Sequence, residues 1–137
     1  MVWRWWRSWL GRASRSPAEM QAQFLAQRAA LEVEFFHLAV SSGKPRGLRW
    51  VGIDWSPEVA FAREKATGRL AALVGVTIHF EALAGSDMEE LPAVGQPRHG
   101  SAVFFVLDDR WHTQGRAFFN LAPAEVLEQL AGQYDRA

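Results

Sequence analysis

The chain of 137 residues is 49% hydrophobic and 22% charged, a composition typical of one folded globular domain rather than a disordered or fibrous chain. It contains no cysteine, which excludes disulfides, thiolate metal sites and cysteine nucleophiles. The net charge is zero, but residues 1–15 carry four of the fifteen basic residues and no acidic one, so residues 16–137 are mildly acidic. Because phosphate binding needs a basic surface, we expect that residues 16–137, the body of the protein, do not bind nucleic acid.

Residues 1–15 are the most unusual segment, since they hold four of the seven tryptophans. Placed on a helix at about 100° per residue, the indoles fall on one broad arc and the arginines on the opposite one. Such a helix can lie in the headgroup region of an anionic membrane or enter a groove on a partner protein. A third alternative is that its indoles pack on the domain's own sheet or helix, or that the segment stays disordered. The residues expected to contact a membrane or partner are Trp3, Arg4, Trp5, Trp6, Arg7, Trp9, Leu10 and Arg12.

A long helix is predicted from about Pro17 to Val40. Ser16 as N-cap, Pro17 at the first helical position and Glu19 three residues after the cap are typical of a capping box, and residues 41–45 end the helix. Its apolar residues form two stripes. The first stripe is Met20, Phe24, Leu31, Phe35 and Leu38, and the second is Leu25, Val33, Phe36 and Val40.

Three strands are predicted next. Residues 48–55 alternate in polarity, a turn at Ser56-Pro57 leads to a strand over 59–64, and a hairpin loop at 65–68 leads to a long strand over 70–81. The long strand has one apolar and one mixed face, which indicates a sheet covered on a single side.

The remainder predicts a short helical turn, a hairpin and a final helix. Residues 83–100 are irregular, with a second capping-box pattern at 86–89, and strands over 102–107 and 111–119 are joined by a tight turn. The last helix starts at Pro123 and includes Tyr134 on its inner face. The order α-β-β-β-(short α)-β-β-α predicts an α+β two-layer sandwich, in which a five-stranded antiparallel meander sheet is flanked by the N-terminal long helix and the C-terminal helix.

No catalytic motif is present, but four polar residues of the predicted sheet could surround a ligand pocket or an acid–base site. They are Asp54, His79, Glu81 and His112. Solvated side chains on an exposed sheet face are the competing interpretation. Trp50, Trp55 and Trp111 near Asp54 could likewise form a ligand cluster or pack in the core. The histidines at 37, 79, 99 and 112 lack metal-ligand spacing, so no metal or cofactor is expected.

Two functional hypotheses follow. The first is a non-enzymatic binding or adaptor protein, which residues 1–15 attach to an anionic membrane surface or a protein partner. The alternative is a small ligand-binding domain or enzyme with the pocket just described. No apolar run is long enough to cross a bilayer and no secretory signal is recognisable, so we expect a cytoplasmic protein, peripheral at the membrane under the first hypothesis. Exposed sheet edges leave a homodimer open.

Overall fold

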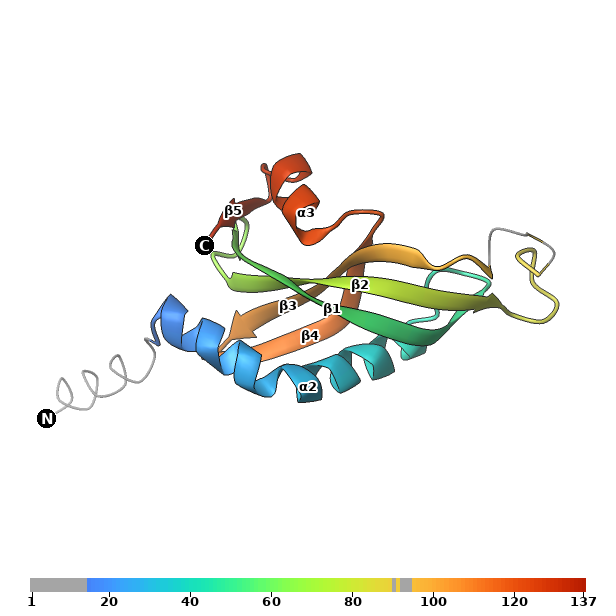
Figure 1. The fold of residues 1–137 in the computed structure, drawn as a ribbon, viewed down its shortest axis with the longest axis horizontal. Helices are drawn as coiled ribbons and strands as arrows, with labels where there is room; N and C mark the ends of the chain where they lie inside the picture. The colour runs from blue at the N-terminus through green and yellow to red at the C-terminus, as the bar shows by residue number, and fades with distance from the viewer. Residues whose placement is uncertain (1–14, 90, 92–94) are drawn as a thin grey trace, which may run out of the picture.

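The structure, a computed structural model, describes residues 15–89, 91 and 95–137, so the amphipathic segment predicted for residues 1–15 lies outside the described residues except for Arg15. In chain order the elements are α2 (Pro17–Ser41), β1 (Leu48–Glu64), β2 (Leu70–Ala82), β3 (Arg98–Leu107), β4 (Arg110–Phe119), α3 (Pro123–Gln129) and β5 (Tyr134–Arg136). The strands form one antiparallel sheet in the order β4-β3-β2-β1-β5 (Figure 1). The predicted α+β class, with a five-stranded antiparallel sheet and a helix near each end, is confirmed.

The long helix α2 starts where the sequence predicts. The Ser16 hydroxyl accepts a hydrogen bond from the Glu19 backbone N–H at 3.1 Å, and Pro17 occupies the first turn, where its missing N–H costs nothing. Five residues of one face are buried against the sheet: Met20, Phe24, Leu31, Phe35 and Ala39. Leu38, expected on this face, remains 38% exposed, and Ala39 is buried there instead.

The main difference from the predicted elements concerns Ser56-Pro57, which lies inside β1 instead of turning the chain between two strands. β1 pairs with β2 on both sides of Ser56-Pro57, and the register shifts there, between Trp55 and Val59, as it also does between Trp50 and Gly52. Proline is tolerated there because β5 pairs only with residues 62–64, which leaves the outer edge of this part of β1 without a described strand partner. On that edge the Ser56 carbonyl oxygen accepts a hydrogen bond from the Arg28 guanidinium.

The fifth strand comes from the C-terminus. α3 ends at Gln129, and Tyr134, predicted on the inner face of that helix, instead pairs with Glu64 of β1. The short helix predicted after Ser86 is also replaced, within residues 83–89, by turns. There the Glu89 carboxylate accepts the Gly85 N–H at 2.6 Å, so it stabilises a turn and not a helix start. The observed order is therefore α-β-β-β-β-α-β.

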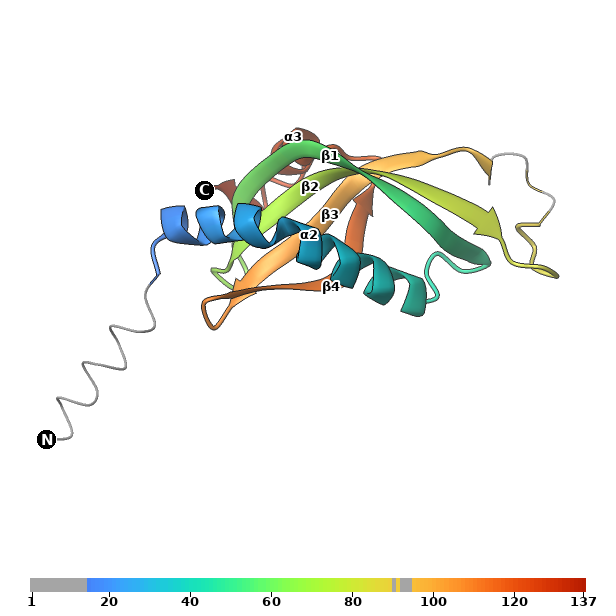
Figure 2. The same ribbon diagram turned by 60° about the horizontal axis from the view of Figure 1, so that its bottom comes forward.

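The two helices lie on opposite faces of the sheet and not together on one apolar face as expected (Figures 1 and 2). Alternate residues of β2 explain this arrangement. Leu70, Ala72 and Val74 belong to the core under α2, whereas Ala71 and Leu73 belong to a smaller core with Val126 and Leu127 of α3. We call the two sides the α2 face and the α3 face. α3 covers only one end of its face, so the polar residues farther along β2 remain open to solvent.

Aromatic rings fill the core between α2 and the sheet. Phe24 contacts Trp111 at a centroid distance of 4.9 Å, and Phe35 contacts Trp55 at 5.4 Å, both edge to face. Such contacts add about 0.5–1.5 kcal/mol per pair beyond area burial. Every buried side-chain nitrogen and oxygen among the described residues has a hydrogen-bond partner. The body of the protein therefore has a filled and polar-satisfied core of its own.

Candidate functional site

The open end of the α3 face carries a histidine–carboxylate pair. Gly52 of β1 lies opposite His79 of β2, and this register brings Asp54 within reach, so that His79 Nε2 lies 2.7 Å from Asp54 Oδ2. Both side chains are exposed, Asp54 to 76%. Next along the strands, Glu81 forms an ion pair with Arg49, its direct partner on β1. The structure thus brings Asp54 and His79 together, while Glu81 pairs elsewhere.

His112 lies at another part of the sheet. Its cross-strand partner is Phe105, whose own partner on β2 is Ala71, eight residues from His79. At about 3.3 Å per residue this offset separates the two histidines by roughly 26 Å along the strands. The His112 ring stacks on Phe105 at 5.9 Å, and its Nε2 lies 3.2 Å from the Leu107 carbonyl oxygen. The four residues expected to surround one pocket therefore do not converge.

The Asp54–His79 pair alone has the parts of an acid–base dyad without a site around it. A carboxylate can orient an imidazole for proton transfer, but catalysis also needs a concavity that holds the substrate against it. The hollows described below are lined by other residues. The three tryptophans proposed as a ligand cluster belong instead to the core: Trp50 and Trp111 are buried, and Trp55 is partly buried against Phe35, which also contacts Trp50.

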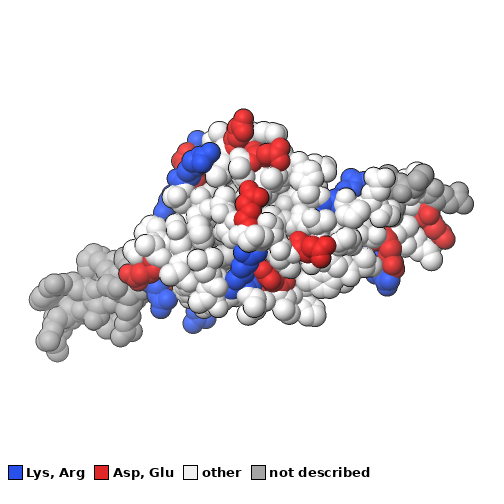
Figure 3. All heavy atoms as spheres, in the orientation of Figure 1, with Lys and Arg blue, Asp and Glu red and all other residues white. Residues whose placement is uncertain are grey.

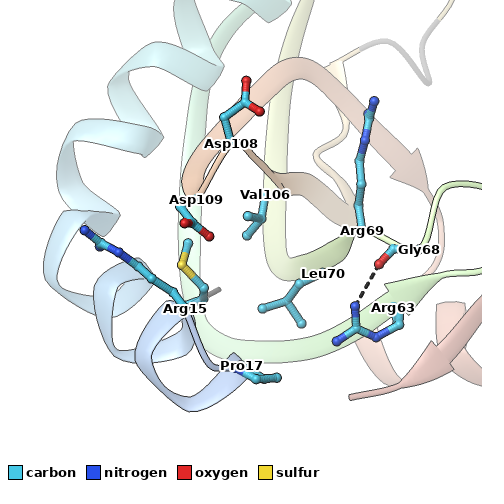
Figure 4. A pocket seen from close by; sticks show the side chains of 10 residues that line it. Arg15, Pro17, Arg63, Gly68, Arg69, Leu70, Val106, Asp108 and Asp109 are labelled. Carbon is cyan, nitrogen blue, oxygen red and sulfur yellow. Dashed lines mark hydrogen bonds between the residues drawn. The ribbon is translucent and has the colours of Figure 1, made fainter. Parts of the chain in front are cut away.

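A hollow of about 670 Å³ lies where α2 begins (Figure 4). Its floor is apolar, with Met20, Leu70 and Val106. Its charged residues come from three segments: Arg15 before α2, Arg63 and Arg69 on either side of the β1–β2 loop, and Asp108 and Asp109 in the β3–β4 turn. Arg63 is held by a 2.7 Å hydrogen bond to the Gly68 carbonyl oxygen. The guanidinium groups of Arg15 and Arg63 and the two carboxylates line this hollow, whereas the Arg69 guanidinium lies over the Phe105 ring on the other face of the sheet.

This hollow was missed by sequence reasoning, although its parts were visible. The loop at 65–68 and the turn at 108–110 were both predicted, and alternate loops of a meander lie at the same end of a sheet. What the sequence did not reveal is that the start of α2 lies at this end too. Both aspartates of the turn adopt left-handed backbone angles, with φ of 54° and 58°, which fits a tight two-residue hairpin.

A second, smaller hollow of about 70 Å³ on the α3 face contains the Tyr134 side chain. Burial raises the pKa of the Tyr134 phenol, the nearby Glu64 carboxylate raises this pKa further, and Arg116 opposes both effects. Arg116 lies over the Phe118 ring and Arg69 over the Phe105 ring, at 5.0 and 5.2 Å from the centroids. The hollow is too small for a ligand of ordinary size, and we assign its residues a packing role.

Within the part of the chain that the structure describes, no group of three or more histidines and carboxylates could hold a metal ion. None of the described helices is both long and apolar enough to cross a membrane. Comparison with known proteins finds no matching family model, no matching curated protein and no matching solved structure. Function must therefore be argued from the chain itself.

Proposed function

We propose that this is a non-enzymatic binding protein, which residues 1–15 attach to an anionic membrane surface. The observation that carries the proposal is in the sequence: when residues 1–15 are placed on a helix, four indoles and four guanidinium groups fall on opposite sides. Indoles prefer the interface between headgroups and acyl chains, and arginines bind lipid phosphates. A surface-bound amphipathic helix uses both.

Two features of the body support a separate role for residues 1–15. α2 has its own N-cap at Ser16, so residues 1–15 precede the helix instead of extending its hydrogen-bonded ladder. Figure 3 shows acidic and basic side chains interspersed on the face in view, without a broad basic surface. Attachment to an anionic surface would thus depend on the N-terminal segment, because the two carboxylates of the adjoining hollow balance Arg15 and Arg63 there.

The alternative of a pocket enzyme has less support from the geometry. Its four residues lie on two separate parts of the sheet, and the one pair that forms, Asp54–His79, is open to solvent. A binding role needs no such convergence. It needs a stable body and a segment that recognises a surface.

Vesicle binding by the full chain tests the proposal. We compare vesicles of phosphatidylcholine alone with vesicles that also contain phosphatidylserine, by co-sedimentation at two salt concentrations. Replacing Arg4, Arg7 and Arg12 by glutamine is expected to weaken binding roughly a hundredfold, because each basic group near such a surface contributes about 1 kcal/mol. Added salt should weaken binding by the intact chain, since the attraction is screened.

The matched control removes the same charge from the body. Arg46, Arg98 and Arg110 are exposed arginines, and their replacement by glutamine should leave vesicle binding within a few-fold. Alanine at Trp3, Trp6 and Trp9 should abolish binding even with all arginines present. Equal binding to neutral and anionic vesicles, or equal losses in the tail and control variants, would contradict the proposal. A full chain that binds neither vesicle would favour the protein-partner alternative for residues 1–15.

A further inference from the structure

The exposed side of α2 carries a second apolar stripe, which is open to solvent except at Phe36, a partly buried residue that packs against the core. Sequence reasoning identified four of its members, and the structure adds two alanines on the same line. The stripe consists of Ala22, Leu25, Ala29, Val33, Phe36 and Val40. Leu25 is 60% exposed and Val33 59%, which is unusual for large apolar side chains on a helix whose other side is already fully packed. Such an apolar surface marks an interaction site.

The stripe is straight. Ala22 and Val40 are eighteen residues apart, which is five turns at about 3.6 residues per turn, so they lie at the same angle on the helix. With a rise of about 1.5 Å per residue the stripe is about 27 Å long. It therefore suits another extended element lying along α2 better than a compact ligand.

Beside the stripe lies a hollow of about 350 Å³ between α2 and the outer edge of β1. Phe36 and Val33 line it from the helix, and Ile53 and Trp55 line it from the strand. This stretch of β1 has no described strand partner on its outer side. The hollow can accept an apolar side chain from whatever packs on the stripe.

The stripe is complementary to itself in reverse. When a second copy runs antiparallel and is centred on position 31, Ala22 faces Val40, Ala29 faces Val33, and Ala26, at the border of the stripe, faces Phe36. Each small side chain then meets a larger one, as close packing between two helices requires. The reversed Leu25 also falls beside Phe36, at the hollow next to β1. A symmetric two-fold interface demands this kind of self-complementarity, whereas an unrelated partner does not.

The charges around the stripe favour a protein surface over a membrane. α2 contains three glutamates and one arginine, so it is anionic, opposite to what a membrane-surface helix needs. The arginine, Arg28, is bound at 2.8 Å to Glu32 and also donates to the Ser56 carbonyl oxygen. These partly buried charges are satisfied within one chain, so a dimer would bury no unpaired charge here.

We infer that a second copy of this chain packs on the apolar stripe, antiparallel and about a two-fold axis near position 31, to form a symmetric dimer. The inference is independent of the proposed membrane attachment. Such a dimer would present two N-terminal segments, one at each end of the helix pair. Two segments would bind a common surface with higher avidity than one.

Cysteine cross-linking tests the register directly, because the chain has no cysteine of its own. Ala22→Cys and Val40→Cys chains are made separately, both at exposed positions. Each variant alone should remain uncross-linked on oxidation, since its two cysteines would be about 27 Å apart in the dimer. The mixed chains should give a covalent dimer. Cross-linking of either variant alone, or none in the mixture, would overturn the inference.

Light scattering and sedimentation of the full chain provide the second test. The chain of 15.4 kDa should have twice this mass in solution. Val33→Lys should convert it to the monomer with an unchanged circular dichroism spectrum, because the residue is exposed and makes no core contact. Leu107→Lys, at an exposed leucine of the β3–β4 hairpin, is the matched control and should leave the dimer intact. A monomeric wild type, or a Val33→Lys chain that stays dimeric, would overturn the inference.

Discussion

Trp111 donates its indole Nε1–H to the backbone carbonyl oxygen of Met20 at 2.7 Å, across 91 positions of sequence. Both residues are buried, so water cannot replace the bond. The contact fixes the first turn of α2 against the edge strand β4, and the Trp111 ring packs against Phe24 beside it. It therefore joins two elements that lie far apart in the sequence.

Trp111→Phe is expected to lower the free energy of unfolding by about 1–3 kcal/mol. Phenylalanine preserves much of the apolar volume but removes the donor and leaves space beside the helix. Urea denaturation measures the change. Trp55→Phe is the matched control, because the Trp55 indole nitrogen has no hydrogen bond to a described residue and its ring is only partly buried. Equal losses in the two variants would show that ring size, and not the hydrogen bond, is responsible.

Gly115 of β4 lies close to the backbone of α2. Its φ of +72° favours glycine, and a Cβ added here would lie 2.6 Å from the Ala39 backbone nitrogen. Gly115→Ala should therefore cost more than 2 kcal/mol, since the backbone of α2 must move. Gly43 has a similar φ of +68° but open space around it, so Gly43→Ala should cost only about 1 kcal/mol. Thermal or urea unfolding of both variants separates steric clash from backbone strain, and equal losses would contradict the close approach.

The Thr113 hydroxyl stabilises the bulge of β4 between Thr113 and Ala117, which contains Gly115. It donates to the Val103 carbonyl oxygen at 3.0 Å and accepts the Gly115 N–H at 3.1 Å, and the site is buried. Thr113→Val keeps the shape but leaves both backbone groups without this partner, so we expect a loss of about 1–3 kcal/mol in urea denaturation. Thr113→Ser retains the hydroxyl and should recover most of that loss. A valine variant as stable as wild type would show that water or a shifted backbone satisfies both groups.

Local signals in the sequence were sufficient to predict the ends of those elements that neighbouring residues determine. Ser16, Pro17 and Glu19 locate the start of α2 because capping is a short-range interaction. The prediction of a turn at Ser56-Pro57 was wrong because contacts distant in the sequence decide the structure there. The pair favours a turn in isolation, but the continuous partner strand β2 and an outer edge free of strand pairing let the proline remain inside β1.

The candidate sites depend on register and on which elements meet, and neither is local. Asp54 meets His79 only because residues 48–64 form one strand, which the predicted turn at Ser56-Pro57 excluded. His112 was placed near them by alternation alone, which identifies a face of a strand but not a position along the sheet. The apolar stripe of α2, by contrast, was predicted from its 3.6-residue period, and only its exposure required the structure.

Tyr134, the only tyrosine of the chain, should make stability depend on pH in the alkaline range. Burial raises the pKa of its phenol above the ordinary value of 10.0 in the folded protein. Above pH 10 the unfolded chain therefore loses this proton while the folded chain retains it, so the free energy of unfolding falls as pH rises from the unfolded toward the folded pKa. Below pH 10 both states are protonated and this contribution is constant.

Tyr134→Phe removes that dependence while preserving the ring that packs edge to face against Phe118. The difference in free energy of unfolding between wild type and variant should be constant below pH 10 and should shift in favour of the variant above it, because only wild type loses stability through the phenol. Urea denaturation at a series of pH values measures the difference, and the lysines and arginines common to both chains cancel. Phenolate absorbance of the folded wild type reports the same pKa independently, without unfolding. Two results would contradict this prediction: a phenol that titrates at its ordinary value, or a stability difference that is the same at every pH. Either would mean that the Tyr134 phenol is more open to water than the burial of this residue implies.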